Sequence, residues 1–348
     1  MTEATETDST YATETLDHRS KGGITCYLFR QGKEVSHDVS LDEVSNFLHQ
    51  PDALVWVDVV DPNVGVMDKL ASVFHLHPLA IEDAVQAHQR PKIEAYGTYW
   101  FIVVKGVTMK DQDLTFHEVA IFASNQFVVT VRQVPAYPWD EVQQRWRAHP
   151  ESLKTGGGFL LYTMLDSVVD DYGPVDQMIE DRVDRLEEQL FDPDYQNQLK
   201  RLLPEIFNLK KQAQEFRHAA VPMRDILNPL VRGDLGLFPS DDALYFRDVY
   251  DHAVRIIDEL DTMRELVNSA LEIHTSVVSN RQNEIVTQLT LIASFFLPLT
   301  FIVGFFGMNF GFLVDHIVSP GVFFALGLGS EVVAVVGTFI YLKMKGWF

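Results

Sequence analysis

Residues Leu289–Asn309 read LTLIASFFLPLTFIVGFFGMN, without a single charged side chain. About 20 apolar residues are enough for a helix to cross a hydrocarbon core of about 30 Å. A second apolar run, Val322–Leu342, follows after a short link and contains one charged residue, Glu331. Two buried core helices of a soluble domain are the alternative, but such helices usually keep a polar face. The two runs therefore predict two transmembrane helices.

The composition limits the partners of this chain. It has 348 residues, enough for one large soluble domain and a membrane part, and its 49 acidic and 28 basic residues give a formal net charge of −21. This charge argues against nucleic acid as a partner and is compatible with attracting cations. The single cysteine, Cys26, excludes an internal disulfide and a cysteine-based zinc cluster, and we interpret it as a strand residue.

The chain ends and the link between the apolar runs predict the membrane topology. Met1–Lys21 is rich in Thr, Glu and Asp and lacks the apolar segment of a signal peptide, so we expect a disordered tail. Lys343 and Lys345 follow the second run, whereas the link Phe310–Gly321 contains Asp315 and no Lys or Arg. Positive charge favours the cytoplasmic side. We expect a multi-pass cell-membrane protein with both termini in the cytoplasm.

The first third of the chain predicts an α/β domain. Short apolar runs rich in β-branched and aromatic residues alternate with helical patterns, and the last three runs are joined by short links, which favours a mixed sheet. The predicted strands are Ile24–Phe29, Leu54–Asp58, Tyr99–Val107, Val119–Phe122 and Phe127–Val131, and the predicted helices are Val64–Phe74 and Pro78–Gln86.

The middle of the chain predicts helices. Gly156–Gly158 is not followed by Gly-Lys-Ser/Thr, so it is not a phosphate-binding loop, and we expect a flexible start of a helix. Phe159–Phe191 is helical in pattern and strongly acidic, and Asp194–Leu230 carries several basic residues, so the two segments predict an antiparallel hairpin. Charge runs of this kind are usually solvated helix faces.

A very long helix is predicted after this hairpin. Between Ala243 and Leu297 there is no Pro or Gly, and a helix from Asp242 to about Asn309 would be roughly 100 Å long. A helix of this length needs partners along its side.

The long helix has an apolar seam and an acidic stripe. The seam residues recur at the spacing of a coiled coil, at Val249, Ala253, Ile256, Leu260, Met263, Val267 and Ala270. The acidic residues recur every seven residues, at Asp251, Asp258, Glu265 and Glu272. Two interpretations stay open at this point. The helix packs on its own domain with a hydrated acidic side, or symmetry-related copies surround a shared axis.

Several motifs resemble the CorA family of divalent-cation channels. The family signature is a GMN triplet at the end of the first of two C-terminal membrane helices, and Gly307-Met308-Asn309 stands there. Further matching motifs are Glu82-Asp83, HQRPK at His88–Lys92, FRDVYDH at Phe246–His252, Asn283-Glu284, PLTF at Pro298–Phe301 and the ending Gly346-Trp347-Phe348. The resemblance covers nearly the whole chain from about Ile24. It implies a homopentameric, funnel-shaped channel with an α/β cytoplasmic domain, a long helical stalk and two transmembrane helices.

A candidate pore-lining stripe follows from the same three- and four-residue spacing. It contains Asn283, Val286, Leu289 or Thr290, Ala293, Leu297, Thr300 and Gly304 and ends at the GMN triplet. Polar and apolar positions alternate along it, and none is charged. Neutral oxygens can hold hydrated Mg²⁺ through its waters, which the ion releases reluctantly. The apolar positions are candidates for a hydrophobic constriction or for ordinary helix packing.

The resemblance also implies residue roles. Asn309 side chains and Gly307 carbonyls would form the outer selectivity filter, and Met308 would shape the turn. Asp83, with Glu82 beside it, and Asp248 match cytoplasmic Mg²⁺-sensing positions, and Asp170 is a further candidate. Ordinary surface salt bridges are the alternative for these carboxylates.

The link and the second run depart from the family pattern. The Met-Pro-Glu-Leu run is missing, and Gly311 stands where an acidic residue often follows, so Asp315 is a candidate substitute. Glu331 is a carboxylate inside a predicted span, which is costly and suggests proton coupling or a hydrogen bond between helices.

Two rival functions remain open. One is a Zn²⁺ transporter of the same superfamily, since His75, His77 and His88 are potential ligands, although the first two more simply pack or cap a helix. The other is a membrane-anchored enzyme, but the α/β domain contains no nucleophile–base pair or nucleotide loop, and we expect no enzyme activity and no organic cofactor. Mg²⁺, as cargo and regulator, is the expected ion, with Co²⁺ and Ni²⁺ as similar-sized alternatives.

The predicted domains follow these patterns. They are the tail (1–23), the α/β domain (24–150), the helical hairpin (151–239), the cytoplasmic stalk (240–288), the first transmembrane helix (289–309), the outer link (310–321), the second transmembrane helix (322–342) and the basic C-terminus (343–348).

Overall fold

The structure is a computed structural model that describes residues 23–50, 52–86, 88–110, 113–149, 156–190, 195–308, 311, 316 and 319–347. The predicted tail, the filter residue Asn309 and Asp315 of the link lie outside the described residues. Two compact units are present, one up to Ala270 and one from Leu271 onward.

A mixed sheet of seven strands is the centre of the described part of the first unit, as the sequence predicted. The strands are β1 (Ile24–Arg30), β2 (Lys33–His37), β3 (Ala53–Val60), β4 (Lys92–Ala95), β5 (Trp100–Lys110), β6 (Asp113–Ala123) and β7 (Phe127–Arg132). Their order is β2-β1-β3-β7-β6-β5-β4, and β3 pairs with β7 in parallel while the other neighbours are antiparallel. The short edge strands β2 and β4 were not predicted, because their residues are mostly half-exposed and carry no long apolar run.

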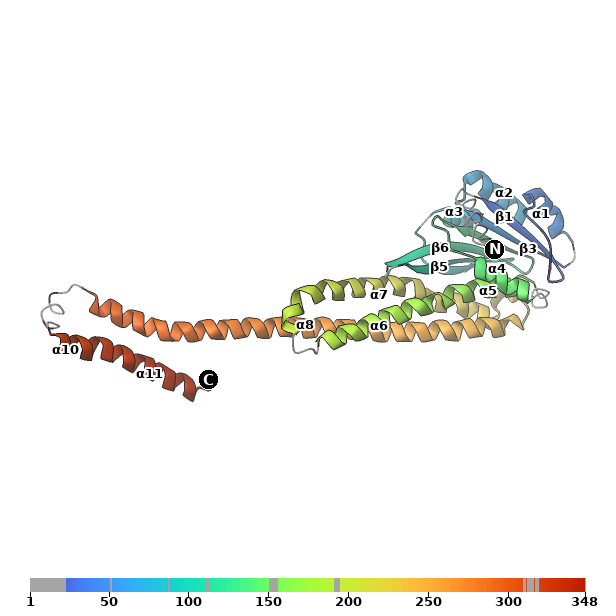
Figure 1. Cartoon of the computed structure of the whole chain (residues 1–348). Helices are drawn as coiled ribbons and strands as arrows, with labels where there is room; N and C mark the ends of the chain where they lie inside the picture. The colour runs from blue at the N-terminus through green and yellow to red at the C-terminus, as the bar shows by residue number, and fades with distance from the viewer. Residues whose placement is uncertain are drawn as a thin grey trace, which may run out of the picture. The chain divides into compact units, whose positions relative to one another are not determined.

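Helices cover both faces of this sheet (Figure 1). Strand β3 is buried on both sides, because Val55, Val57 and Val59 pack under the first three helices while Trp56 faces the aromatic ring of Trp146. The first three helices are α1 (Leu41–Leu48), α2 (Val64–Phe74) and α3 (Pro78–Val85), of which α1 was not predicted. On the other face lie α4 (Asp140–Ala148), α5 (Gly157–Asp170), α6 (Tyr172–Leu190) and α7 (Tyr195–Arg232).

The start of α5 corrects one prediction. The glycine triplet is a close-packed contact rather than a flexible segment, since Gly157 and Gly158 are buried. A Cβ added at Gly157 would lie 2.0 Å from the carbonyl oxygen of Ser124, and one at Gly158 would lie 2.0 Å from Oδ2 of Asp242. Only glycine lets this helix approach the sheet and Asp242, the first residue of the longest helix, so closely.

The predicted acidic segment forms two helices instead of one, with the break at Asp171. Helices α6 and α7 pack on each other, as the predicted hairpin requires. The acidic residues are not all solvated, because Asp166 and Asp176 are buried. Each of these two carboxylates lies among other charged side chains, and both enter the arguments below.

The long helix α8 spans Asp242–Phe306 and ends three residues before the predicted end. In the first unit, all seven predicted seam residues, from Val249 to Ala270, are buried against their own chain. The four residues of the acidic stripe, from Asp251 to Glu272, are exposed. The seam residues therefore pack on the helix's own domain, as the first interpretation has it, and the exposed acidic side of α8 is left uncovered by its own chain.

The second unit contains the two candidate spans. They are the C-terminal part of α8 and the segment Pro320–Met344, with mean hydropathies of 2.2 and 1.9 in their most apolar windows, and neither window is buried by its own chain. The second candidate consists of α10 (Pro320–Val322), a π-helical turn η3 (Phe323–Leu328) and α11 (Gly329–Met344). Their exposed apolar side chains need lipid or other protein as cover.

Candidate functional site

The predicted pore-lining stripe lies along the C-terminal part of α8. Every member is exposed in the single chain, namely Asn283, Val286, Leu289, Thr290, Ala293, Leu297, Thr300, Gly304, Gly307 and Met308. The stripe is thus free to face other copies or a water-filled path.

Two threonine hydroxyl groups of α8 donate their hydrogens to backbone carbonyls of the same helix. Oγ1 of Thr300 donates a hydrogen bond to the carbonyl oxygen of Phe296 at 2.8 Å, and Oγ1 of Thr290 donates to that of Val286 at 2.7 Å. A hydroxyl has one hydrogen to donate and two lone pairs to accept with. With the hydrogen used inside the helix, each hydroxyl presents only acceptors outward, which suits the waters around a cation.

The C-terminal end of α8 leads directly into the GMN triplet. The Gly307 amide donates to the Val303 carbonyl at 2.9 Å, and the Met308 amide donates to the Phe305 carbonyl at 3.3 Å. A Cβ at Gly307 would come within 3.1 Å of the Val303 oxygen, so the turn is tight there. Helix C-termini carry partial negative charge and unpaired carbonyls, which favour a nearby cation.

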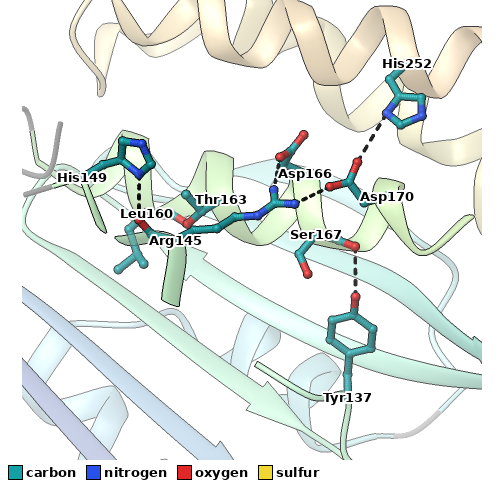
Figure 2. Close-up of polar contacts among 9 residues, drawn as sticks. All are labelled: Tyr137, Arg145, His149, Leu160, Thr163, Asp166, Ser167, Asp170 and His252. Atoms are coloured by element: carbon teal, nitrogen blue, oxygen red, sulfur yellow. Dashed lines mark hydrogen bonds and ion pairs between the residues drawn. The ribbon is translucent and has the colours of Figure 1, made fainter. Parts of the chain in front are cut away.

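A cluster of charged side chains joins α4, α5 and α8 in the first unit (Figure 2). The Arg145 guanidinium bridges Asp166 and Asp170, with 2.6 Å between Nη2 and Oδ2 of Asp170. His252 of α8 approaches Asp170 from the other side, with 3.6 Å between Nδ1 and Oδ1. Burial raises the pKa of Asp166, the Asp170 charge raises it further, and Arg145 opposes both.

Asp248 belongs to this same cluster. It is exposed on α8 one turn before His252, and its charge helps to raise the pKa of Asp166. Burial, followed by the charges of Asp166 and Asp248, raises the pKa of Tyr162 to about 12. Two predicted sensor positions, Asp170 and Asp248, therefore act on the same carboxyl group, that of Asp166. Arg145 was missed because α4 was not predicted, whereas His252 already stood in the quoted FRDVYDH run.

The other two predicted sensor residues lie in α3. Asp83 accepts a hydrogen bond from Nζ of Lys92 at 2.6 Å, and the same ammonium donates to Glu94 at 2.6 Å. Glu82 is exposed and accepts from Nε2 of Gln86 at 3.0 Å. Within the described part of the chain, no ion pair connects this group to the α4–α5–α8 cluster. In that same part, no three His, Cys, Asp or Glu side chains are arranged to hold a metal ion.

Two of the three histidines considered for zinc, His75 and His77, have structural roles, whereas His88 lines a cavity described below. His77 is the N-cap of α3 and accepts from the Leu79 amide at 3.2 Å through Nδ1, and His75 ends α2 in the left-handed conformation. Capping is what the sequence favoured for both.

Glu331 lies in the first turn of α11, directly after the π-helical turn η3.

Comparison with known proteins decides the family. The model of the family described as "CorA-like Mg2+ transporter protein" matches residues 51–344. The chain belongs to this CorA family. The putative metal ion transporter YfjQ of Bacillus subtilis is 35% identical, and the match covers 86% of this chain and 92% of YfjQ. The cobalt/magnesium transport protein CorA of Thermotoga maritima is 33% identical, and the match covers 84% of this chain and 83% of the Thermotoga protein.

A solved structure agrees with the fold. The complete CorA magnesium transporter of Methanocaldococcus jannaschii matches 93% of this chain and 98% of its own, with a TM-score of 0.70 and 22% identity. The CorA membership and this fold confirm an α/β domain, a long helix and two C-terminal candidate transmembrane helices in one membrane transporter.

Proposed function

We propose that this CorA-family chain forms a homopentameric channel in the cell membrane that admits Mg²⁺ and, as similar-sized cargo, Co²⁺ and Ni²⁺. Both termini face the cytoplasm. The observation that carries the proposal is the uncharged stripe on α8, which its own chain leaves uncovered and which ends at the GMN triplet. The names of the Thermotoga and Methanocaldococcus relatives, which refer to cobalt and magnesium transport, support the choice of ions.

Selection acts on the hydrated ion. Mg²⁺ keeps its waters tightly, and those waters donate hydrogen bonds to neutral acceptors. Thr300 offers such acceptors because its own hydrogen is bonded to Phe296. Asn309 amide oxygens and Gly307 carbonyls form the outer ring, beside the negative end of α8. A ring without formal charge binds the ion weakly enough to release it.

The apolar positions of the stripe close the path. Val286, Leu289 and Leu297 form successive apolar rings when copies of α8 surround one axis. A narrow apolar ring expels water and stops a hydrated ion without a physical plug. Opening therefore requires the copies to move apart.

Intracellular Mg²⁺ controls that movement. A single chain holds Asp83 and Asp248 in separate groups, so a metal site built from both needs two subunits. Lys92 already neutralises Asp83 at 2.6 Å, and Mg²⁺ has to displace this ammonium group to bind there. Bound Mg²⁺ bridges neighbouring subunits and favours the closed state, and loss of Mg²⁺ releases them.

Ion flux into lipid vesicles tests the function. Purified protein should admit Mg²⁺ without nucleotide or other added substrate, and Asn309→Ala should abolish this flux while the oligomer stays intact. Leu244→Ala, at an exposed apolar position of the cytoplasmic unit, is the matched control and should retain flux. Normal flux through Asn309→Ala would remove the filter from the proposal. The same vesicles with Zn²⁺ and an imposed pH gradient test zinc transport and proton coupling through Glu331.

Currents from excised patches test the regulation. Asp248→Lys should still conduct but should need several-fold more internal Mg²⁺ for half inhibition, because a positive charge opposes the bridging ion. Asp251→Lys makes the same charge change on the exposed acidic stripe of α8 and should leave inhibition by internal Mg²⁺ unchanged. Equal inhibition of wild type and Asp248→Lys would contradict the sensor assignment.

A further inference from the structure

A cavity of about 500 Å³ in the cytoplasmic unit has a charge opposite to that of the chain. Its nine lining residues come from the segment before β4, from β5 and from α7, and they are His88, Gln89, Arg90, Pro91, Lys105, Arg217, His218, Val221 and Pro222. None is acidic, although acidic residues outnumber basic ones 49 to 28 in the whole chain. Three permanent cations and two imidazoles therefore surround one space.

The cationic groups are only partly used by the protein. Among the described residues, Arg90 has no hydrogen bond or ion pair and is exposed. Arg217 bonds to Asp261 through Nε at 2.9 Å, and its two terminal nitrogens have no hydrogen bond to the described residues. Lys105 of β5 interacts with Glu118, its cross-strand neighbour. The Glu118 carboxylate also accepts hydrogen bonds from the backbone of His88 and Gln89, so it lies against the cavity wall although it is not part of the lining. The Arg90 guanidinium and the terminal nitrogens of Arg217 thus offer hydrogen-bond donors to the cavity that the described residues do not use.

The remaining lining residues define the size and shape of a ligand. Pro91, Val221 and Pro222 supply apolar walls, and the rings of His88 and His218 are flat surfaces for an aromatic group. Cavities of about 300–1,000 Å³ hold small organic ligands and cofactors. Arg and Lys are the side chains that bind phosphate most often.

We propose that this cavity binds a free nucleotide, with its phosphates at Arg90, Lys105 and Arg217 and its base against the proline and histidine surfaces. The cationic lining repels Mg²⁺, so the metal-free nucleotide binds better than its Mg²⁺ complex. Free nucleotide accumulates when Mg²⁺ is scarce, since Mg²⁺ binds to nucleotide phosphates. The cavity would then report Mg²⁺ depletion to the channel; this regulatory consequence rests on the proposed function, but nucleotide binding does not.

Calorimetric titration of the full-length protein in detergent tests the site. ATP in EDTA at low salt should bind saturably, at least tenfold more tightly than inorganic phosphate, and excess Mg²⁺ should weaken binding. Arg90→Gln with Lys105→Met should weaken ATP binding by about tenfold or more, because each lost charged donor removes a strong hydrogen bond. Arg224→Gln, at an exposed position two turns beyond Arg217 along α7, should change affinity by less than about twofold.

Four outcomes would overturn the proposal. They are absence of saturable ATP binding, equal affinity for ATP and phosphate, unchanged affinity in the double variant, and binding that requires Mg²⁺ and so reflects an acidic metal site. Arg90→Gln alone keeps the test valid if Lys105→Met disturbs the sheet, because the Arg90 side chain has no partner in the described structure. These readouts measure binding without transport, so a failure here is separate from a failure of the channel proposal.

Discussion

The two parts of α8 have similar apolar spacing but different surroundings. In the first unit Leu260 is 0% exposed, and the whole seam from Val249 to Ala270 is buried by its own chain. In the second unit Leu297 is 69% exposed, and no residue of the most apolar window is buried. A three- and four-residue apolar period therefore identifies a contact surface without saying whether the partner is the same chain, another copy or lipid.

The charged residues beside the two parts explain the difference. The part of α8 in the first unit carries side chains that pair with neighbouring helices, as Asp261 does with Arg217 and His252 with Asp170. The membrane part carries no charge between Leu289 and Phe306. Burial on its own domain fixes the first part, and only lipid and further copies can cover the second.

Shortening one leucine in each part of α8 should give the largest difference, because one leucine packs within its own domain and the other belongs to the proposed apolar ring. Leu260→Ala removes a fully buried side chain and should lower the free energy of local unfolding around α8 by about 2–5 kcal/mol. Hydrogen–deuterium exchange with mass spectrometry measures this in the peptides of α6 and α8. Leu297→Ala should leave exchange in the first unit unchanged and should raise Mg²⁺ flux at high internal Mg²⁺, because it widens the proposed apolar ring.

Two results would contradict this contrast between the two parts of α8. If Leu260→Ala left exchange unaltered, the seam would not stabilise the domain. If Leu297→Ala increased exchange in the helices of the first unit to a similar extent, the membrane part would not be a separate contact surface.

A smaller, pH-dependent effect is expected at Asp176 of α6. This carboxyl is 6% exposed and faces Glu259 of α8 and Glu180 one turn away; burial first, and then these two carboxylates, raise its pKa from 3.8 to about 7. Between these values the folded state holds more protons than the unfolded state, so stability falls as the pH rises from about 4 to 7. Asp176→Asn should remove this loss and stabilise the protein by about 1–3 kcal/mol at pH 8, and less at pH 5.

Thermal unfolding at the two pH values measures this effect. Asp258→Asn, an exposed carboxylate on α8, is the control and should shift neither curve appreciably. A destabilising effect of Asp176→Asn at pH 8 would mean that the ionised carboxylate contributes to the helix packing.

Much of the fold could be predicted from the sequence, because long apolar runs and motif positions are local signals. The strands β3 and β5, the mixed sheet, both candidate spans and α8 from Asp242 are all visible in the printed residues. The edge strands and α4 were missed because they depend on contacts with other elements. The partner of the seam was left open for the same reason. Helix α1 was missed although its capping box, Ser40 with Glu43, is a local signal in the sequence.

The candidate site was less accessible to sequence reasoning. The grouping of Asp170 with Asp248 depends on how α5 packs beside α8, and the bridging Arg145 comes from a helix with no strong pattern. The ion pair between Asp83 and Lys92 joins two quoted motifs, but the spacing of nine residues does not reveal it. The filter, pore and sensor roles remain proposals.

Cysteine labelling in the pore tests the central claim most directly. Burial raises the pKa of the Cys26 thiol to about 11, so this native cysteine reacts slowly at neutral pH. Thr300→Cys and Phe301→Cys place a thiol at neighbouring exposed positions of α8, one on the stripe and one beside it. A charged, water-soluble thiol reagent should block Mg²⁺ flux through Thr300→Cys and leave Phe301→Cys unaffected. Block of both or of neither, with the protein folded and conducting beforehand, would contradict a water-filled path along this stripe.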